Sequence, residues 1–196
     1  CEEHKEVAKD LMDKAITLVK NTKNQLPITP QTHKRIMLYT IENGGFTPNK
    51  MDKATLQDRV KAELEAQGFE VDVFDNSAGL NGKQLLASTP VKEFVSKYDA
   101  VMLFISVTGF STSNVRRITW NLPMGPEIPW YVTELPTVCV SVHNPFHLID
   151  VPMVPTYINS YSDNDEAIHQ VIQKIMGKSE FKGISPVDAF CGAWDT

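Results

Sequence analysis

The sequence predicts an α/β fold: a doubly wound three-layer αβα sandwich around a mostly parallel sheet of five or six strands. The first observation is Asp99–Val107, whose apolar run from Ala100 has no charge and no alternation, as expected of a central strand covered on both faces. The second is that such runs alternate along the chain with segments of helical spacing. The third is the length of 196 residues with 42% hydrophobic content, which suits one domain with a good core. We therefore expect residues 1–196 to form a single α/β domain.

Each expected element has its own local signal. Apolar residues recur at helical spacing over Glu3–Val19, which predicts an amphipathic helix whose opposite side carries lysines and acids. Further helices are expected where the same spacing is bounded by capping or stop residues: Ala54–Gln67, Thr89–Tyr98 with Pro90 in its first position, and Glu166–Met176 capped by Asp163 or Asp165. The expected strands are Arg35–Ile41, Phe69–Phe74, Asp99–Val107, Pro136–Val142 and Thr156–Tyr161. Of these, Phe69–Phe74 alternates apolar and acidic residues, which favours a position near a sheet edge.

The segment after the central strand is the best candidate for function. Ligands of open α/β sheets bind beyond the carboxyl ends of the strands, and Thr108–Val132 occupies that place where a crossover helix would be expected. Within it, Asn114, Arg116, Arg117 and Trp120 combine donors for hydroxyl or carboxylate groups with an aromatic face, as is typical of sugar sites and of interfaces. The alternative is that the tryptophans of this segment, Trp120 and Trp130, only anchor it to its own domain.

Several classes of partner are disfavoured. The net charge of −5, with lysines and acids interleaved, argues against nucleic acid. No apolar run is long enough for a membrane span, and no glycine pattern fits a dinucleotide fingerprint or a Walker loop. His143 and His147 have the separation of a helical metal pair, but Pro145 lies between them and no third ligand is evident. We therefore expect no metal and no cofactor.

Cysteine and aspartate chemistry is also weighed against structural roles. Cys139 lies in a strand, which raises the hypothesis of a nucleophile, but the small flanking residues of a nucleophile elbow are missing, which favours a buried thiol. Asp72, Asp75 and Asp99 lie at strand ends, where solvated carboxylates or helix caps are usual. Because the first residue is Cys1 and not Met, we expect the chain to come from a longer gene product.

Landmarks in order along nearly the whole chain resemble the carboxyl-terminal domain of glycoside hydrolase family 3. They are EVAKDLMDKAITLVKNTKNQLPITPQTHKRIMLY, FISVTG, RR with NLP, PTVCVSVHNPFHLIDVP, PTYINSYS and MGKSEFKGISPV. The stretches NVRRITW, PMGPEIPWYV and HNPFHLIDVP look most like the Gram-positive β-N-acetylglucosaminidases (β-N-acetylhexosaminidases), which act on cell-wall fragments. Many β-glucosidase-type members have E-G-x-D-R where this chain has Ser113–Arg117, so only the arginine of that pattern remains.

The resemblance implies an accessory role. In that family the aspartate nucleophile lies on an amino-terminal barrel, and in the β-N-acetylglucosaminidases so does the histidine proton donor with its aspartate partner. We therefore expect that the catalytic barrel is absent from this chain, that the chain has no catalytic residue of its own and is inactive alone, and that it packs on that barrel beside a carbohydrate substrate.

Other readings remain open at this point. One is a purely structural or dimerising domain, including a homodimer, and another is a stand-alone hydrolase or amidotransferase-like enzyme that uses Cys139. The resemblance further implies a bacterial protein of the cell envelope or exterior, although the residues themselves leave the compartment unknown.

Overall fold

The computed structural model describes residues 2–44, 54–74, 90–109, 117–120 and 128–193. The helices within these ranges are α1 (Glu2–Ala15), α2 (Leu56–Ala66), α3 (Val91–Lys97) and α4 (Asp165–Ile175), with 3₁₀ turns η3 (Trp130–Thr133) and η4 (His147–Ile149). The strands are β1 (Thr17–Asn21), β2 (Arg35–Gly44), β3 (Glu70–Val73), β4 (Ala100–Thr108), β5 (Thr137–Ser141) and β6 (Thr156–Asn159). Among the helices of these ranges, none combines the length and apolar character that crossing a bilayer requires.

The six strands form one mixed sheet in the order β1-β6-β5-β4-β2-β3. β4 lies inside it and pairs in parallel with β2 on one side and β5 on the other. Seven of the first eight residues of β4 are buried, which explains why this run contains no charged residue. The predicted α/β fold, the predicted central strand and the edge position of β3 are therefore confirmed.

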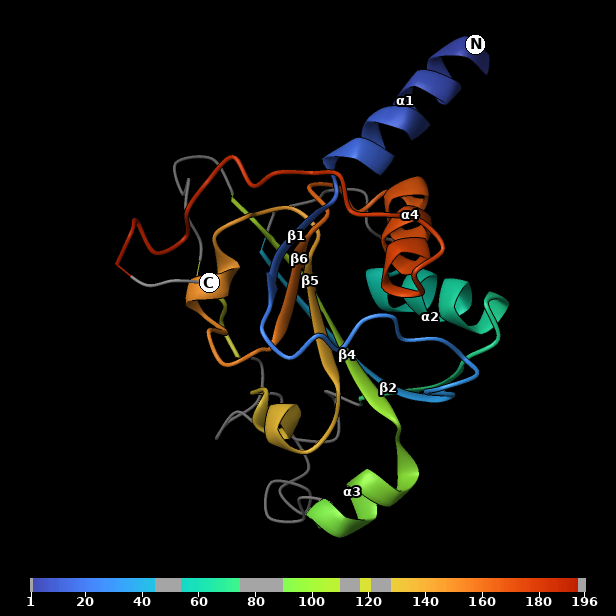
Figure 1. Cartoon of the computed structure of the whole chain (residues 1–196), viewed down its shortest axis with the longest axis vertical. Helices are drawn as coiled ribbons and strands as arrows, with labels where there is room; N and C mark the ends of the chain where they lie inside the picture. The colour runs from blue at the N-terminus through green and yellow to red at the C-terminus, as the bar shows by residue number, and fades with distance from the viewer. Residues whose placement is uncertain (1, 45–53, 75–89, 110–116, 121–127, 194–196) are drawn as a thin grey trace.

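Two core clusters lie on opposite faces of the sheet. α2 and α4 cover one face with aliphatic side chains such as Leu64 and Ile172. The opposite face is covered by α3, η3 and η4, and its cluster is rich in aromatic rings such as Phe94 and Tyr131. The layers lie around the sheet in Figure 1, where α1 stands at one end of the molecule and α3 lies at the other.

The predicted helix over Glu3–Val19 is wrong in its last four residues. α1 ends at Ala15, and the chain continues as β1, which pairs antiparallel with β6 and places Thr17 opposite Asn159. A helical periodicity and a short strand share the residues Ile16–Val19, and the hydrogen bonds offered by β6 decide between them. The sequence therefore did not predict β1, the strand that runs antiparallel to its neighbour β6.

Smaller differences concern the ends of elements. Pro90 is the N-cap of α3 and not its first residue, and the N-cap of α4 is Asn164, whose side chain accepts a hydrogen bond from the Ala167 amide. Neither Asp163 nor Asp165 caps that helix. β2 continues to Gly44, three residues beyond the expected strand Arg35–Ile41.

Candidate functional site

The carboxyl edge of the sheet is the place where the parallel strands end and the longest connections leave. β5 is followed there by His143, and β6 is followed by a polar turn that leads into α4. α2 and α4 both begin at this edge, since each follows a parallel strand. The polar side chains at this edge form two separate clusters, one on each face of the sheet.

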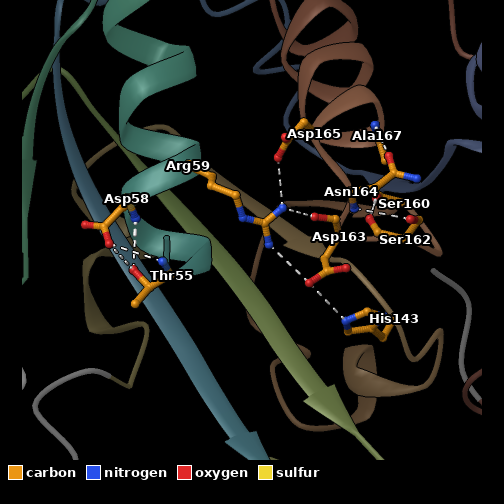
Figure 2. A network of polar contacts seen from close by, with 10 residues as sticks. All are labelled: Thr55, Asp58, Arg59, His143, Ser160, Ser162, Asp163, Asn164, Asp165 and Ala167. Carbon is orange, nitrogen blue, oxygen red and sulfur yellow. Dashed lines mark hydrogen bonds and ion pairs between the residues drawn. The ribbon is translucent and has the colours of Figure 1, made fainter. Parts of the chain in front are cut away.

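The first cluster is organised by Arg59 in α2, whose side chain is 24% exposed. Its Nη2 lies 3.2 Å from Asp163 Oδ2 and its Nη1 lies 3.1 Å from Asp165 Oδ1, while the same Nη1 also donates to the Asp163 carbonyl. His143 Nε2 lies 3.7 Å from Asp163 Oδ2 on the far side of that carboxylate (Figure 2). The Arg59 guanidinium thus joins α2 to the start of α4, and the Asp163 carboxylate connects it to His143 after β5.

The helix starts beside Arg59 are closed by their own side chains. Thr55 and Asp58 form a capping box, in which the Asp58 amide donates to Thr55 Oγ1 at 3.1 Å and the Thr55 amide donates to Asp58 Oδ2 at 3.2 Å (Figure 2). Thr55 Oγ1 also donates to Asp58 Oδ2 at 2.7 Å, and this hydrogen bond, followed by the one from the Thr55 amide, lowers the pKa of Asp58. At α4, Asn164 Oδ1 accepts from the Ala167 amide at 2.8 Å. Both helix starts therefore hold their own carboxylate or amide oxygen where an anionic ligand would bind.

The second cluster is organised by Asp150, which follows η4 and whose side chain is 7% exposed. It accepts hydrogen bonds from Arg117 Nε and from the Ile118 amide, the latter at 3.2 Å, and its Oδ2 lies 3.1 Å from His147 Nδ1. His147 is itself buried, and within the described residues its Nε2 has no hydrogen-bond partner. Asp150 therefore attaches the Arg117–Trp120 segment to the body of the domain.

The Arg117 side chain is held at Nε and is otherwise largely exposed to solvent. Its Nε is bound to Asp150, yet its side chain is 64% exposed. A guanidinium fixed at Nε keeps its planar fork of Nη donors in one orientation, which suits hydroxyl and carboxylate oxygens. Trp120 lies on the same segment, half-buried against the aromatic cluster.

The remaining predicted residues divide clearly. Asn114 and Arg116 lie outside the described residues, as does Asp75. Trp130 packs on the domain itself, with its ring centroid 5.0 Å from that of Phe94, as the anchoring alternative expected. The sequence analysis did not identify Arg59 or Asp150. For Asp150 a signal was present, because two polar residues three positions apart, such as His147 and Asp150, can pair within a short turn.

Cys139, Asp72 and Asp99 have structural surroundings in the fold. Cys139 is fully buried, and burial raises the pKa of its thiol, so it is neither accessible nor readily ionised. Asp72 accepts from the Tyr98 hydroxyl and Asp99 pairs with Arg35, so both have structural partners. In the ranges that the structure describes, no group of three or more metal-ligating side chains occurs.

Comparison with known proteins finds relatives that are larger enzymes. It is 36% identical over 194 residues to the beta-N-acetylglucosaminidase/beta-glucosidase of Cellulomonas fimi, which covers 99% of this chain and 34% of that protein. No protein-family profile matches the chain. Among solved structures, "Beta-glucoside phosphorylase BglX" superposes with a TM-score of 0.80 at 34% identity, covering 98% of this chain and 33% of that one.

A more distant structure supports the same fold. The glycoside hydrolase family 3 beta-N-acetylglucosaminidase from Paenibacillus superposes with a TM-score of 0.66 at 14% identity over 96% of this chain and 33% of its own. The chain thus spans about a third of the length of the relatives that it matches.

Proposed function

We propose that this chain is the accessory carboxyl-terminal domain of a glycoside hydrolase family 3 β-N-acetylglucosaminidase, a proposal supported by its similarity to part of the longer relatives. It packs on a catalytic barrel and forms one side of the cleft that holds a carbohydrate containing N-acetylglucosamine. The observation that carries this proposal is Arg117, which Asp150 holds at Nε while most of its side chain stays exposed beside Trp120.

The division of labour follows from the chemistry of glycoside hydrolysis. A retaining enzyme needs a nucleophilic carboxylate and a proton donor about 5 Å apart on either side of the scissile bond. At the carboxyl edge, Asp163 and Asp165 both pair with Arg59, and Asp150 pairs with Arg117, so these carboxylates already have cationic partners. The reacting groups therefore come from the barrel.

The domain contributes binding and shielding. The Nη groups of Arg117 donate hydrogen bonds to sugar oxygens on the leaving-group side, and the ring of Trp120 offers an apolar face to the sugar. Closing the cleft from this side removes water from around the reacting bond, which strengthens each electrostatic contact inside it.

The named relatives differ in the group that accepts the sugar. One is a β-N-acetylglucosaminidase/β-glucosidase and another is a β-glucoside phosphorylase. Activity is therefore measured with aryl β-N-acetylglucosaminide and aryl β-glucoside, each in the presence and absence of inorganic phosphate. A rate that depends on phosphate would assign phosphorolysis to the enzyme in place of hydrolysis.

The central experiment compares two arginines that each pair with an aspartate. In the full-length enzyme we expect Arg117→Ala to lower kcat/KM by about 10-fold or more, which is the loss of one charge-assisted contact. The control is Arg35→Ala, which breaks the Arg35–Asp99 pair at the amino edge, where Nη2 and Oδ1 lie 2.6 Å apart. We expect this control to leave kinetics unchanged.

The competing structural reading makes a different prediction. If the domain only stabilises the barrel or a homodimer, both arginine variants will retain full kcat/KM in enzyme that remains folded. That result would overturn the role of Arg117 in the cleft. Turnover of either substrate by the 196-residue chain alone would overturn the accessory role itself.

A further inference from the structure

Helix α1 stands away from the rest of the domain. Every described side chain from Glu3 to Leu11 is exposed. Figure 1 shows the amino-terminal turns of α1 extending beyond the sheet, while its last turn approaches α4. Because an isolated helix of this length is only marginally stable in water, a partner that covers its exposed turns would stabilise it.

The residues of α1 that are half-buried are Met12 and Asp13, and Asp13 forms ion pairs with the rest of the domain. Asp13 Oδ1 lies 2.7 Å from Lys174 Nζ of α4, and Asp13 Oδ2 lies 2.9 Å from Lys182 Nζ. The side chain of Lys174 is completely buried and also donates to the Glu180 carbonyl at 2.5 Å. This arrangement fixes the rotation of α1 about its own axis.

The apolar side of α1 consequently points outward. Val7 is 54% exposed and Leu11 is 57% exposed, and the two lie one turn apart on the same side of the helix. Asp13 follows Leu11 by two residues, which is a rotation of about 200° at 3.6 residues per turn. An amphipathic helix normally buries its apolar stripe against its own domain, whereas Val7 and Leu11 of α1 remain exposed.

A third exposed aliphatic residue lies beside the end of α1. Ile184 is 90% exposed. It follows Gly183, which packs so tightly on the helix end that an added Cβ would lie 2.6 Å from the Ala15 carbonyl oxygen. Ile184 therefore adds an exposed aliphatic side chain close to the carboxyl end of α1.

This surface lies at the same edge of the sheet as the candidate site. Thr17, two residues after the end of α1, pairs with Asn159, the last residue of β6. The carboxyl end of α1 thus lies at the carboxyl edge of the sheet, where Arg59 and Arg117 also lie. A single partner body seated on that edge would cover both α1 and the candidate site.

We infer that Val7, Leu11 and Ile184 form the surface on which the remainder of the family 3 enzyme docks, through an apolar groove that receives the outer side of α1. The inference rests on the proposed function, which supplies the partner. It is supported by the relatives, which match this chain from end to end and are about three times as long. The polar contacts of Asp13 then orient the helix for its partner.

The test measures hydrogen exchange of the α1 amides in the 196-residue chain and in the full-length enzyme. We expect exchange of residues 4–12 to slow by at least 10-fold in the full-length enzyme. Leu11→Asp should restore fast exchange there. The matched control is Val91→Asp, which places the same charge at a helical valine that is 45% exposed at the opposite end of the molecule (Figure 1), and it should change nothing.

Two outcomes would overturn the inference. One is equal exchange of the α1 amides in both proteins. The other is a dimer of the 196-residue chain, seen by sedimentation and broken by Leu11→Asp, because the surface would then belong to a second copy. If the full-length enzyme shows equal exchange but still loses kcat/KM in Arg117→Ala, the docking surface is wrong while the proposed function stands.

Discussion

The two faces of the sheet are covered by different kinds of side chain and by different kinds of backbone structure. The face under α2 and α4 is lined mainly by aliphatic side chains, and regular helices cover it. The other face is covered by the seven residues of α3 and by two 3₁₀ turns. There, stacked rings such as Tyr39 and Tyr131, with centroids 4.8 Å apart, and the buried carboxylate of Asp150 hold irregular chain in place.

The difference shows how an α/β domain can present an irregular segment at its carboxyl edge. A helix brings its own hydrogen bonds, so its face needs only apolar complementarity. An irregular segment has backbone groups that need partners, and Asp150 supplies one to the Ile118 amide. The candidate substrate contact Arg117 belongs to the face with the polar anchor.

The largest effect is expected on the aliphatic face. Leu64 of α2 is completely buried, so Leu64→Ala removes apolar contacts and leaves a cavity. We expect a loss of about 2–5 kcal/mol in the free energy of unfolding, measured by urea denaturation. A smaller loss of unfolding free energy than in Asp150→Ala or Phe94→Leu would contradict the view that the aliphatic face contributes most of the stability.

The next largest effect is expected at the polar anchor of the aromatic face. Asp150→Ala leaves the Ile118 amide, Arg117 and His147 without their acceptor, which should cost about 1–3 kcal/mol. Urea denaturation measures the loss, and Asp10→Ala serves as control because the Asp10 side chain is 57% exposed and pairs only at the surface with Lys14. If Asp150→Ala and Asp10→Ala had equal free energies of unfolding, Asp150 would not stabilise this face of the domain.

A smaller effect is expected within the ring cluster. Phe94 lies 5.0 Å from both Tyr98 and Trp130 between ring centroids. Phe94→Leu keeps much of the apolar volume but loses ring contacts, so we expect about 1 kcal/mol of destabilisation. A change in tryptophan emission should accompany it because Trp130 loses a neighbour. Unchanged emission and stability would show that ring stacking adds nothing to this face.

The smallest effect is a pH dependence on the aliphatic side. The hydrogen bond from Lys174, followed by that from Lys182, lowers the pKa of Asp13 below its ordinary value. Folding therefore gains stability from Asp13 above the unfolded-state pKa, and this gain is lost as the pH falls through the folded-state pKa. Urea midpoints of the parent protein and Asp13→Asn should differ most at neutral pH, and the difference should shrink as the pH falls below the ordinary aspartate pKa of about 4 and through the lower folded-state pKa. A difference that stays constant with pH would contradict this assignment.

Much of the fold was available from local patterns. The uncharged run Ala100–Val107 predicted β4, the helical spacing around Leu64 predicted α2, and the alternation from Phe69 predicted an edge strand. Each of these signals depends only on which residues neighbour one another along the chain and on which sides of the element are buried. The likeness to family 3 was visible for the same reason, since its landmarks are short stretches in a fixed order.

Tertiary structure alone decided the features that join distant positions. β1 exists because β6 accepts it as an antiparallel neighbour, and the segment carrying Arg117 is fixed because Asp150, distant in sequence, points at it. The outward turn of the apolar side of α1 likewise depends on the bond between Asp13 and Lys174. A periodic pattern states that a helix has an apolar side, but only the contacts of the folded chain determine which way that side faces.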